Sequence, residues 1–358
     1  MGWEVDPKAR VANLPVGVQQ RIEILKNLAD DSPVLILDEP TAVLTAEEFE
    51  DLARVLGELK GKGKIVILIA HKLSEVLAVA DRVTVLRRGE VVRTATRSEV
   101  DAAMLAKWMV GSLPEELSSS AEVPSDEGFE LVGAWVKGDR GEAAVAGIDL
   151  QVRRGEIVGL GGVDGNGQVE LAEAVVGVRQ LQNGTRRWKG GPVTDELRVA
   201  YIPQDRQGDG LALEMSIQDN MLITGVRRRN LARGQFLKGR EIAAWARHLV
   251  DAFQIKTPNA ALPVGSLSGG NQQKVVVSRS LDQTPDLLVC ANPTRGLDIR
   301  ATDFVHRQLV AAREAGAAVL LISTDLDELA AIATRTLFLS NGKLVAVEGE
   351  QSLVGGTP

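Results

Sequence analysis

Two adjacent carboxylates, Asp38 and Glu39, follow a short apolar run at residues 34–37. A continuous run of this length is typical of a strand covered on both faces, and a charge left at its end without a partner would be costly. Successive strand residues point to opposite sides, so the two acids can serve different tasks. Asp38 could hold Mg²⁺ and Glu39 could polarise an attacking water, unless both acids simply enter a loop.

A histidine occupies the end of the next apolar run. His71 follows residues 65–70, which predict a second short strand. A lone histidine is usually structural. At the end of a neighbouring strand in the same unit, however, we expect His71 to contact the γ-phosphate of a nucleotide.

A glycine-rich turn joins a predicted strand to a predicted helix within residues 155–176. Such turns let backbone N–H groups converge on an anion at a helix N-terminus. Gly162 and Gly167 fit the phosphate-loop template G-x4-G-K-[ST], but Gln168 replaces the lysine and Val169 replaces the hydroxyl that binds Mg²⁺. The glycines that phosphate binding needs are kept, but the positive charge and the Mg²⁺ ligand are lost. A turn with a purely structural role would explain these glycines equally well.

The chain contains an internal repeat at one constant spacing. Residues 14–20 align with 267–273, 38–41 with 291–294, 69–75 with 322–328, and 88–90 with 341–343, all without a gap. This register predicts a duplicated domain. We expect residues 1–113 to be the C-terminal part of a first copy, residues 114–128 a linker, and residues 129–358 a second, complete copy. About the N-terminal half of the first copy is expected to be missing.

Composition and pattern indicate an α/β protein. Short apolar runs alternate with helical stretches such as residues 45–59 and 301–314, which predicts a mainly parallel sheet flanked by helices. The formal net charge of −7 argues against a general nucleic-acid binder. No apolar stretch approaches the roughly 20 residues that cross a bilayer, so a membrane role requires a partner. Cys290, the single cysteine, is expected to be a buried structural thiol in a reducing cytoplasm.

Four motifs together resemble those of ABC ATPases. Residues 267–273 (Leu-Ser-Gly-Gly-Asn-Gln-Gln) look like their signature loop, and Asp38 with Glu39 looks like their Walker B pair. His71 looks like their switch histidine, and Gln204, within residues 201–206, like the glutamine of their Q-loop. The resemblance implies a P-loop NTPase fold of the ABC cassette type, with one partial and one complete cassette in tandem.

The resemblance is narrower at two places in the second copy. Residues 162–170 and 292–298 are similar to the second cassette of monosaccharide and nucleoside importers, whose two cassettes share one polypeptide. In that family ATP lies between the Walker face of one cassette and the signature loop of the other. Residues 211–263 are expected to form the helical subdomain that meets a membrane permease.

The resemblance assigns roles to the candidate residues. Asp38 would ligate Mg²⁺ through water, Glu39 would act as general base, and His71 would contact the γ-phosphate. Ser268 and the backbone of Gly269 and Gly270 would close over the phosphates from the second cassette. The other nucleotide-binding candidates are Gln272, Gly162, Gly165, Asn166, Gly167, Gln168 and Gln204.

The other nucleotide site would lie between the Walker face of the second copy and the signature loop of the first, and it is altered in every motif. Its loop has Gln168, and Ala291 and Asn292 stand in place of the two acids. Thr324 aligns with the histidine, and residues 15–17 read Pro-Val-Gly in place of Ser-Gly-Gly. We therefore expect one site to hydrolyse ATP and the other at most to hold a nucleotide.

The phosphate loop, adenine-stacking aromatic residue and Q-loop of the competent site are expected to precede Met1. We therefore predict little or no ATPase activity from this chain alone, unless another chain supplies the missing half. The expected partners are membrane permease subunits and, through them, a solute-binding protein, with no nucleic acid. The expected location is the cytoplasmic face of the membrane.

Three functions stay open from the sequence. The first is the energy-coupling subunit of an importer for nucleosides or simple sugars. Within that family, residues 42–45 and 14–26 look more like the nucleoside branch than the ribose or galactose branch. The second is a soluble twin-cassette ATPase that acts on ribosomes or DNA. The third is a regulatory remnant that does not hydrolyse ATP.

Overall fold

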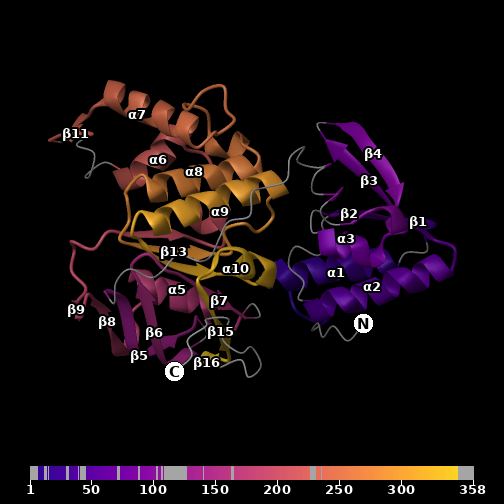
Figure 1. Cartoon of the computed structure of the whole chain (residues 1–358), viewed down its shortest axis with the longest axis horizontal. Helices are drawn as coiled ribbons and strands as arrows, with labels where there is room; N and C mark the ends of the chain where they lie inside the picture. Colours follow the sequence, from indigo (N-terminus) through magenta and orange to yellow (C-terminus); the bar gives the residue numbers. More distant parts are fainter. Residues whose placement is uncertain are drawn as a thin grey trace, which may run out of the picture. The chain divides into compact units, whose positions relative to one another are not determined.

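The computed structural model describes residues 7–11, 14, 16–29, 32–38, 40, 46–70, 73–87, 89–101, 104–105, 108, 127–139, 141–162, 165–225, 231–234 and 236–345. The chain separates into two compact units, one from residues 1–115 and one from most of residues 116–358. Figure 1 shows the elements of each unit. Most of the predicted linker, residues 114–128, lies outside the described residues.

The first unit consists of short α/β elements. In chain order they are α1 (Val16–Ala29), β1 (Val34–Asp38), α2 (Ala46–Gly61), β2 (Ile65–Ile69), α3 (Leu73–Val79), β3 (Arg82–Arg87), β4 (Glu90–Thr96) and the 3-10 turn η2 (Arg97–Glu99). β1 and β2 form a parallel pair, whereas β3 and β4 form an antiparallel hairpin in a separate two-stranded sheet. The strands and the helix predicted in this region are therefore present.

One face of the β1–β2 pair forms the core of the first unit. Leu35 and Leu37 of β1 are buried against Ile24 of α1 and against Leu52 and Leu56 of α2, which lie one helical turn apart.

The opposite face of this pair is exposed. Its five aliphatic side chains are between 40% and 61% exposed: Val34, Ile36, Ile65, Ile67 and Ile69. The prediction that these strands are covered on both faces is therefore wrong for the described residues. The physical reason is that α1 and α2 both cover the same face, and no described layer of this unit covers the other.

The second unit contains two sheets and several helices. Its elements are β5 (Gly128–Lys137), β6 (Ala143–Arg153), β7 (Ile157–Gly161), α5 (Gln168–Val176), β8 (Leu181–Trp188), β9 (Gly191–Pro192), β10 (Val199–Ile202), the π-turn η3 (Arg206–Gly210), α6 (Ile217–Gly225), β11 (Ala232–Arg233), β12 (Phe236–Leu237), α7 (Gly239–Ala252), the 3-10 turn η4 (Val264–Ser266), α8 (Gly269–Leu281), β13 (Leu287–Ala291), α9 (Ile299–Glu314), β14 (Ala318–Ile322), α10 (Leu326–Ile332), β15 (Arg335–Ser340) and β16 (Lys343–Val345). The main sheet has the order β10-β13-β14-β7-β15-β16 and is parallel except for β16. The predicted parallel sheet is thus confirmed.

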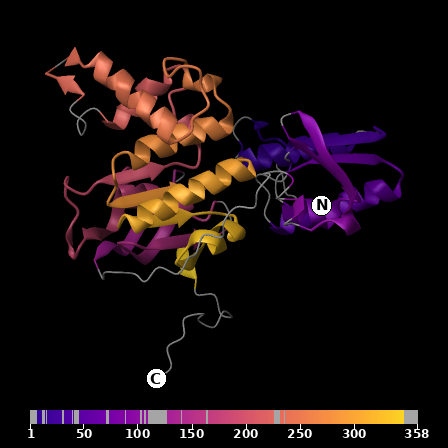
Figure 2. The same cartoon turned by 45° about the horizontal axis from the view of Figure 1, so that its top comes forward.

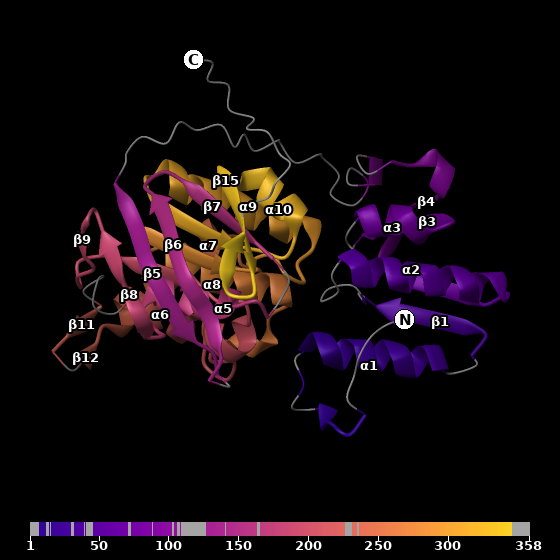
Figure 3. The ribbon, with the colours of Figure 1, turned by 90° about the horizontal axis from the view of Figure 1, so that it is seen from below.

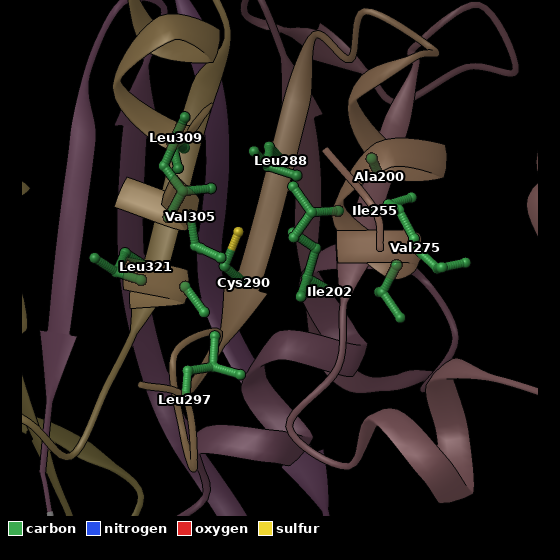
Figure 4. Close-up of a cluster of buried hydrophobic side chains, with 14 of the residues drawn as sticks. Ala200, Ile202, Ile255, Val275, Leu288, Cys290, Leu297, Val305, Leu309 and Leu321 are labelled. Carbon is green, nitrogen blue, oxygen red and sulfur yellow. The ribbon is translucent and has the colours of Figure 1, made fainter. Parts of the chain in front are cut away.

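Apolar clusters cover both faces of this main sheet. On one face, Cys290 of β13 and Leu321 of β14 pack with Val305 of α9 (Figure 4). The helices of this layer, drawn in orange and gold, stay on one side of the sheet when the view is turned (Figure 2). On the other face, Val289 and Leu320 pack with α5 and with the antiparallel sheet β6-β5-β8-β9 (Figure 3). Because both faces are covered, every residue of β7, β13 and β14 is buried.

Cys290 is fully buried in the first of these clusters. Burial raises the pKa of its thiol well above the usual value, since a thiolate would be poorly solvated there. The predicted structural thiol is therefore confirmed.

Residues 211–263 contain α6, α7 and a small β11–β12 hairpin. Ile242, Ala246 and Leu249 of α7 share one buried stripe, which fixes this amphipathic helix on its neighbours. The helical character predicted for this region is confirmed, and the hairpin is an addition. Among the described residues, no helix is both long and apolar enough to cross a bilayer.

The internal repeat extends to strand pairing. Val34 of β1 lies opposite Ile65 of β2, and Leu287 of β13 lies opposite Ala318 of β14. These are aligned positions of the repeat. The β3–β4 hairpin corresponds in the same way to β15–β16.

Candidate functional site

The glycine-rich turn of the second unit follows β7 and opens α5. Gly162, Gly165 and Gly167 have positive φ values of 143°, 89° and 102°. A Cβ at Gly167 would also collide with the carbonyl oxygen of Ala144, so this position requires glycine both for conformation and for space. The described glycines are therefore suited to a glycine-rich turn at a helix N-terminus, the setting in which phosphates are often bound.

The side chain of Gln168 hydrogen-bonds to the backbone of this turn. Its side chain is buried, and its Oε1 accepts a hydrogen bond of 3.0 Å from the backbone N–H of Asn166. The Oδ1 of Asn166 accepts from the N–H of Asn341 at 2.8 Å, and its carbonyl oxygen accepts from the N–H of Gly342 at 3.1 Å. A backbone N–H that a phosphate would use is thus engaged, and residue 168 carries no positive charge. This loop does not fit a magnesium–nucleotide complex poised for hydrolysis.

The signature-like loop lies at the start of α8. Ser268 is the N-cap residue, and its Oγ accepts a hydrogen bond of 2.9 Å from the side chain of Asn271. The Ser268 side chain makes no capping bond to the helix backbone. The N-terminal N–H groups of this 13-residue helix, which include those of Gly269 and Gly270, therefore suit a phosphate.

One hydrogen bond between side chains connects this loop to the segment after β10, and Arg206 connects that segment to the loop after β13. Gln272 is 3% exposed, and its Nε2 donates to the carbonyl oxygen of Leu267 at 3.1 Å. Its Oε1 accepts from Gln207 Nε2 at 3.0 Å. Arg206 donates from Nη1 to the carbonyl oxygen of Arg295 at 3.1 Å. Both polar ends of Gln272 are thus engaged within the protein, so its observed role is to position the loop, and a contact with nucleotide stays a prediction.

Gln204 is half-buried just after β10 and Pro203. Next to it, Asp205 Oδ1 accepts hydrogen bonds of 2.9 Å from the N–H groups of Gln207 and Gly208 and so starts the π-turn. The sequence did not reveal the contact between Gln207 and Gln272. The only sign of this contact in the sequence was that Gln207 is a polar residue in the loop that follows Gln204.

The positions that align with Glu39 and His71 bind each other in the second unit. Asn292 follows β13 with a left-handed φ of 44° and is 7% exposed. Its N–H donates to the carbonyl oxygen of Ile322 at 2.7 Å, and its Oδ1 accepts from the N–H of Thr324 at 3.0 Å. Asn292 therefore joins the ends of β13 and β14. An amide cannot serve as a base for water, so this pair is structural.

A buried carboxylate lies beside this edge. Glu328 of α10 is 4% exposed, and its Oε1 accepts from Thr294 Oγ1 at 2.8 Å and lies 3.1 Å from His306 Nε2. The cluster connects α10, α9 and the loop after β13. No motif or spacing in the sequence indicated it.

In the first unit, Asp38 is exposed at the end of β1, opposite Ile69 at the end of β2. Glu39, which directly follows β1, and His71, two positions after the end of β2, lie outside the described residues. In the part of the chain that the structure describes, no group of three or more His, Cys, Asp or Glu side chains could hold a metal ion. A Mg²⁺ site at Asp38, and its pairing with Ser268 of the other unit, stay predictions.

Comparisons with known proteins bear on these motifs. The sequence profile described as "ABC transporter" matches residues 145–295, which include the glycine-rich turn and the signature-like loop. The chain is 39% identical over 354 residues to the nucleoside import ATP-binding protein NupA of Lactococcus lactis, a match that covers 97% of this chain and 70% of that protein. It is 40% identical to the glucose import ATP-binding protein TsgD13 of Haloferax volcanii, covering 96% of this chain and 64% of that protein.

The chain belongs to the ABC transporter ATP-binding proteins of the sugar and nucleoside import family. It spans about two thirds of the length of these relatives. A solved structure titled "Structure of ATP binding subunit of ABC transporter" has a TM-score of 0.51 and 20% identity, and covers 61% of this chain and 88% of that one. The predicted P-loop NTPase fold of the ABC cassette type is thereby confirmed. The tandem arrangement of cassettes stays a prediction.

Proposed function

We propose that this ABC protein is the ATP-binding subunit of an importer for nucleosides or simple sugars. The match to import ATP-binding proteins along 96–97% of the chain carries the proposal. The N-terminus of α8 supports it, because it offers backbone N–H groups in the way that phosphate binding requires. The solute, nucleoside or sugar, would be chosen by the other components of the importer.

Hydrolysis would take place at one composite site. ATP with Mg²⁺ supplies the reacting phosphoryl group. Asp38 would hold the metal through water, Glu39 would accept a proton from the attacking water, and His71 would contact the γ-phosphate. The N–H groups at the start of α8, with Ser268, would close over the phosphates from the second cassette.

The other site would not hydrolyse ATP. Its cradle has Gln168 bonded to the N–H of Asn166, and its strand edge has Asn292 bonded to Thr324. Neither pair offers a carboxylate as base, and both amide oxygens already accept hydrogen bonds within the protein. This site would hold nucleotide at most, so one ATP would be used in each cycle.

Membrane permease subunits would be the direct partners. The hairpin β11–β12 carries two adjacent exposed apolar side chains, Phe236 at 81% and Leu237 at 57% exposure. Adjacent exposed apolar side chains favour a protein partner. A solute-binding protein would act through the permease, and this chain would be a peripheral protein at the cytoplasmic face of the membrane.

The test is ATP turnover in proteoliposomes by the assembled importer, completed with a polypeptide that supplies the phosphate loop of the competent site. Glu39→Gln should lower turnover at least a hundredfold and leave ATP affinity within threefold, because the base is lost but the phosphate contacts are kept. The matched control is Asn292→Asp at the aligned position of the second cassette, which should keep most of the turnover. Normal turnover in Glu39→Gln would exclude the assigned base.

The solute is tested in the same vesicles. Turnover should rise on addition of the solute-binding protein loaded with nucleosides or with glucose, and whichever class stimulates it identifies the branch. Stimulation by neither class would refute the import role. No observation on the described residues favours a ribosome- or DNA-directed ATPase or a regulatory remnant.

A further inference from the structure

Positive charge is concentrated in one stretch of an otherwise acidic chain. The formal net charge of the whole chain is −7, yet residues 226–248 contain a single acid, Glu241. Their basic residues are Arg227, Arg228, Arg229, Arg233, Lys238, Arg240 and Arg247. The last four of these belong to β11, to α7 or to the segment between β12 and α7, which the structure describes.

Two of these arginines lie on the outer face of α7. Arg240 and Arg247 are exposed and stand seven residues, or about two helical turns, apart, so both lie on one face, away from the buried stripe of this helix. Asp251, one turn beyond Arg247, is an exposed acid on the same face, whereas Glu241 lies about 100° round the helix from Arg240. Positive charge therefore dominates the first two turns of this face.

The β11–β12 hairpin adds a third arginine at the start of α7. Lys238 donates its N–H to the carbonyl oxygen of Leu231 at 2.9 Å, and Leu231 belongs to a buried cluster with Ile242 of α7. These contacts hold the hairpin on the helix. Arg233 lies opposite Phe236, and directly opposed residues of an antiparallel pair have their side chains on the same face. The exposed Arg233 is therefore beside the exposed Phe236.

The charges of these arginines are available to an external anion. In the part of the chain that the structure describes, the guanidinium groups of Arg233 and Arg240 make no ion pair. Arg247 donates from Nε to the carbonyl oxygen of Ala243 at 3.2 Å, a contact with the neutral backbone that leaves its charge uncompensated.

Arg233, Arg240 and Arg247 define a spread basic surface rather than a pocket. The hairpin and α7 form one end of the second unit, and the antiparallel sheet forms the other (Figures 1 and 2). A guanidinium offers a fork of N–H donors that matches the oxygens of a phosphate. Charges that come from two elements without converging on one point suit many phosphates on an extended plane better than a single bound ion.

We propose that this basic surface binds the anionic lipid headgroups around the permease, so that the second unit contacts the bilayer surface as well as its protein partner. The adjacent Phe236 and Leu237 would contact the permease. A permease lies in a bilayer whose cytoplasmic surface is negative, so positive charge beside that contact meets phosphate. The choice of lipid among extended polyanions rests on the proposed function, whereas the basic surface itself rests on residue types and exposure.

The attraction would be electrostatic. Each basic residue near an anionic membrane strengthens binding roughly fivefold, and the effect fades within a Debye length of about 10 Å at 0.1 M salt. The chain as a whole is acidic and is repelled by such a membrane. Binding therefore requires that the basic surface face the headgroups, which would fix the orientation of the second unit on the membrane.

Flotation of the full chain with lipid vesicles tests the proposal. The probes are phosphatidylcholine vesicles with and without phosphatidylglycerol, and the assay needs neither ATP nor a permease. The chain should float with the vesicles that contain phosphatidylglycerol at low salt and should not float with pure phosphatidylcholine. Raising the salt concentration should release it, because salt screens the attraction.

Two double variants with the same change of charge separate this surface from the net charge of the chain. Arg233→Glu with Arg240→Glu should lower binding to the anionic vesicles at least about twentyfold, because two attractive charges are lost and two repulsive ones are added. The matched control is Lys62→Glu with Lys343→Glu, in the turn after α2 and at the start of β16, where both side chains are exposed. It should bind like the unaltered chain, and circular dichroism checks that each variant is folded.

Several results would overturn the proposal. Absence of binding to the anionic vesicles would leave the hairpin to the permease alone. Binding that salt does not weaken, or that both double variants lower equally, would show that the charges of this surface are not its cause. Tighter binding to duplex RNA than to vesicles at equal phosphate concentration would identify a nucleic acid as the partner. A failed turnover assay would count against the importer role and not against this surface.

Discussion

Truncation of one aliphatic side chain should cost far more in the second unit than at the aligned position of the first. Leu320→Ala and Ile67→Ala each remove three carbon atoms from aligned strands. Leu320 is fully buried between the main sheet and the α5 layer, whereas Ile67 is 47% exposed. A cavity forms in the first case and not in the second.

The structure sets the magnitudes. Leu320→Ala should lower the free energy of unfolding by about 3 kcal/mol, as for leucine truncations that leave a cavity. Ile67→Ala should cost about 1 kcal/mol, since about half of the side chain is already in water. Leu35→Ala, on the buried face of β1, is the control within the first unit and should cost about 2–3 kcal/mol.

Urea unfolding of the full chain, followed by circular dichroism, measures these costs. Hydrogen exchange of peptides from β2 and β14 assigns each transition to its unit, because a chain of two units need not unfold in one step. Equal costs for Leu320→Ala and Ile67→Ala would show that the β1–β2 face is covered in solution. That result would refute the exposure of this face.

Two further predictions concern the second unit. Asn292→Ala should be about 1 kcal/mol less stable than Asn292→Gly in urea unfolding, because both lose the bond to Thr324 but only alanine is strained at a φ of 44°; equal stabilities would contradict the strain. The Arg198 guanidinium, which donates to both carboxylate oxygens of Asp286 at 2.8 and 2.9 Å, holds the pKa of that carboxyl below its usual range. Because the pKa of Asp286 is lower in the folded chain than in the unfolded one, its ionised carboxylate stabilises the fold above the unfolded pKa of about 4. This stabilisation is lost as the pH falls through the folded pKa. Asp286→Asn should therefore cost about 1 kcal/mol at pH 7 and progressively less below pH 4, and a cost independent of pH would contradict the linkage.

The glycine positions and the signature-like loop were predictable from sequence, because each depends on a local requirement. Gly167 is needed where φ is positive and a carbonyl oxygen lies close, and Ser268 stands where a helix begins. The pairing of β1 with β2 was also predictable, since the repeat and the apolar runs indicated parallel strands.

Contacts between distant segments were not predictable in the same way. Gln207 and Gln272 meet because β10 and α8 are brought together by the fold. The bond from Gln168 to the Asn166 N–H depends on a rotamer, and so on the packing around α5. The roles of Glu39 and His71 stay predictions, because both lie outside the described residues.

By itself, the sequence determined the class of this protein and the difference in residue type between the aligned motifs of its repeat. The residue type alone decides whether a position can act as a base or carry a charge. Hydrolysis requires a lysine, a glutamate and a histidine, and these positions hold Gln168, Asn292 and Thr324. Only the tertiary structure decided which surfaces are covered. Burial depends on what packs against a strand, so similar apolar runs are buried on both faces in β13 and β14 but on one face in β1 and β2.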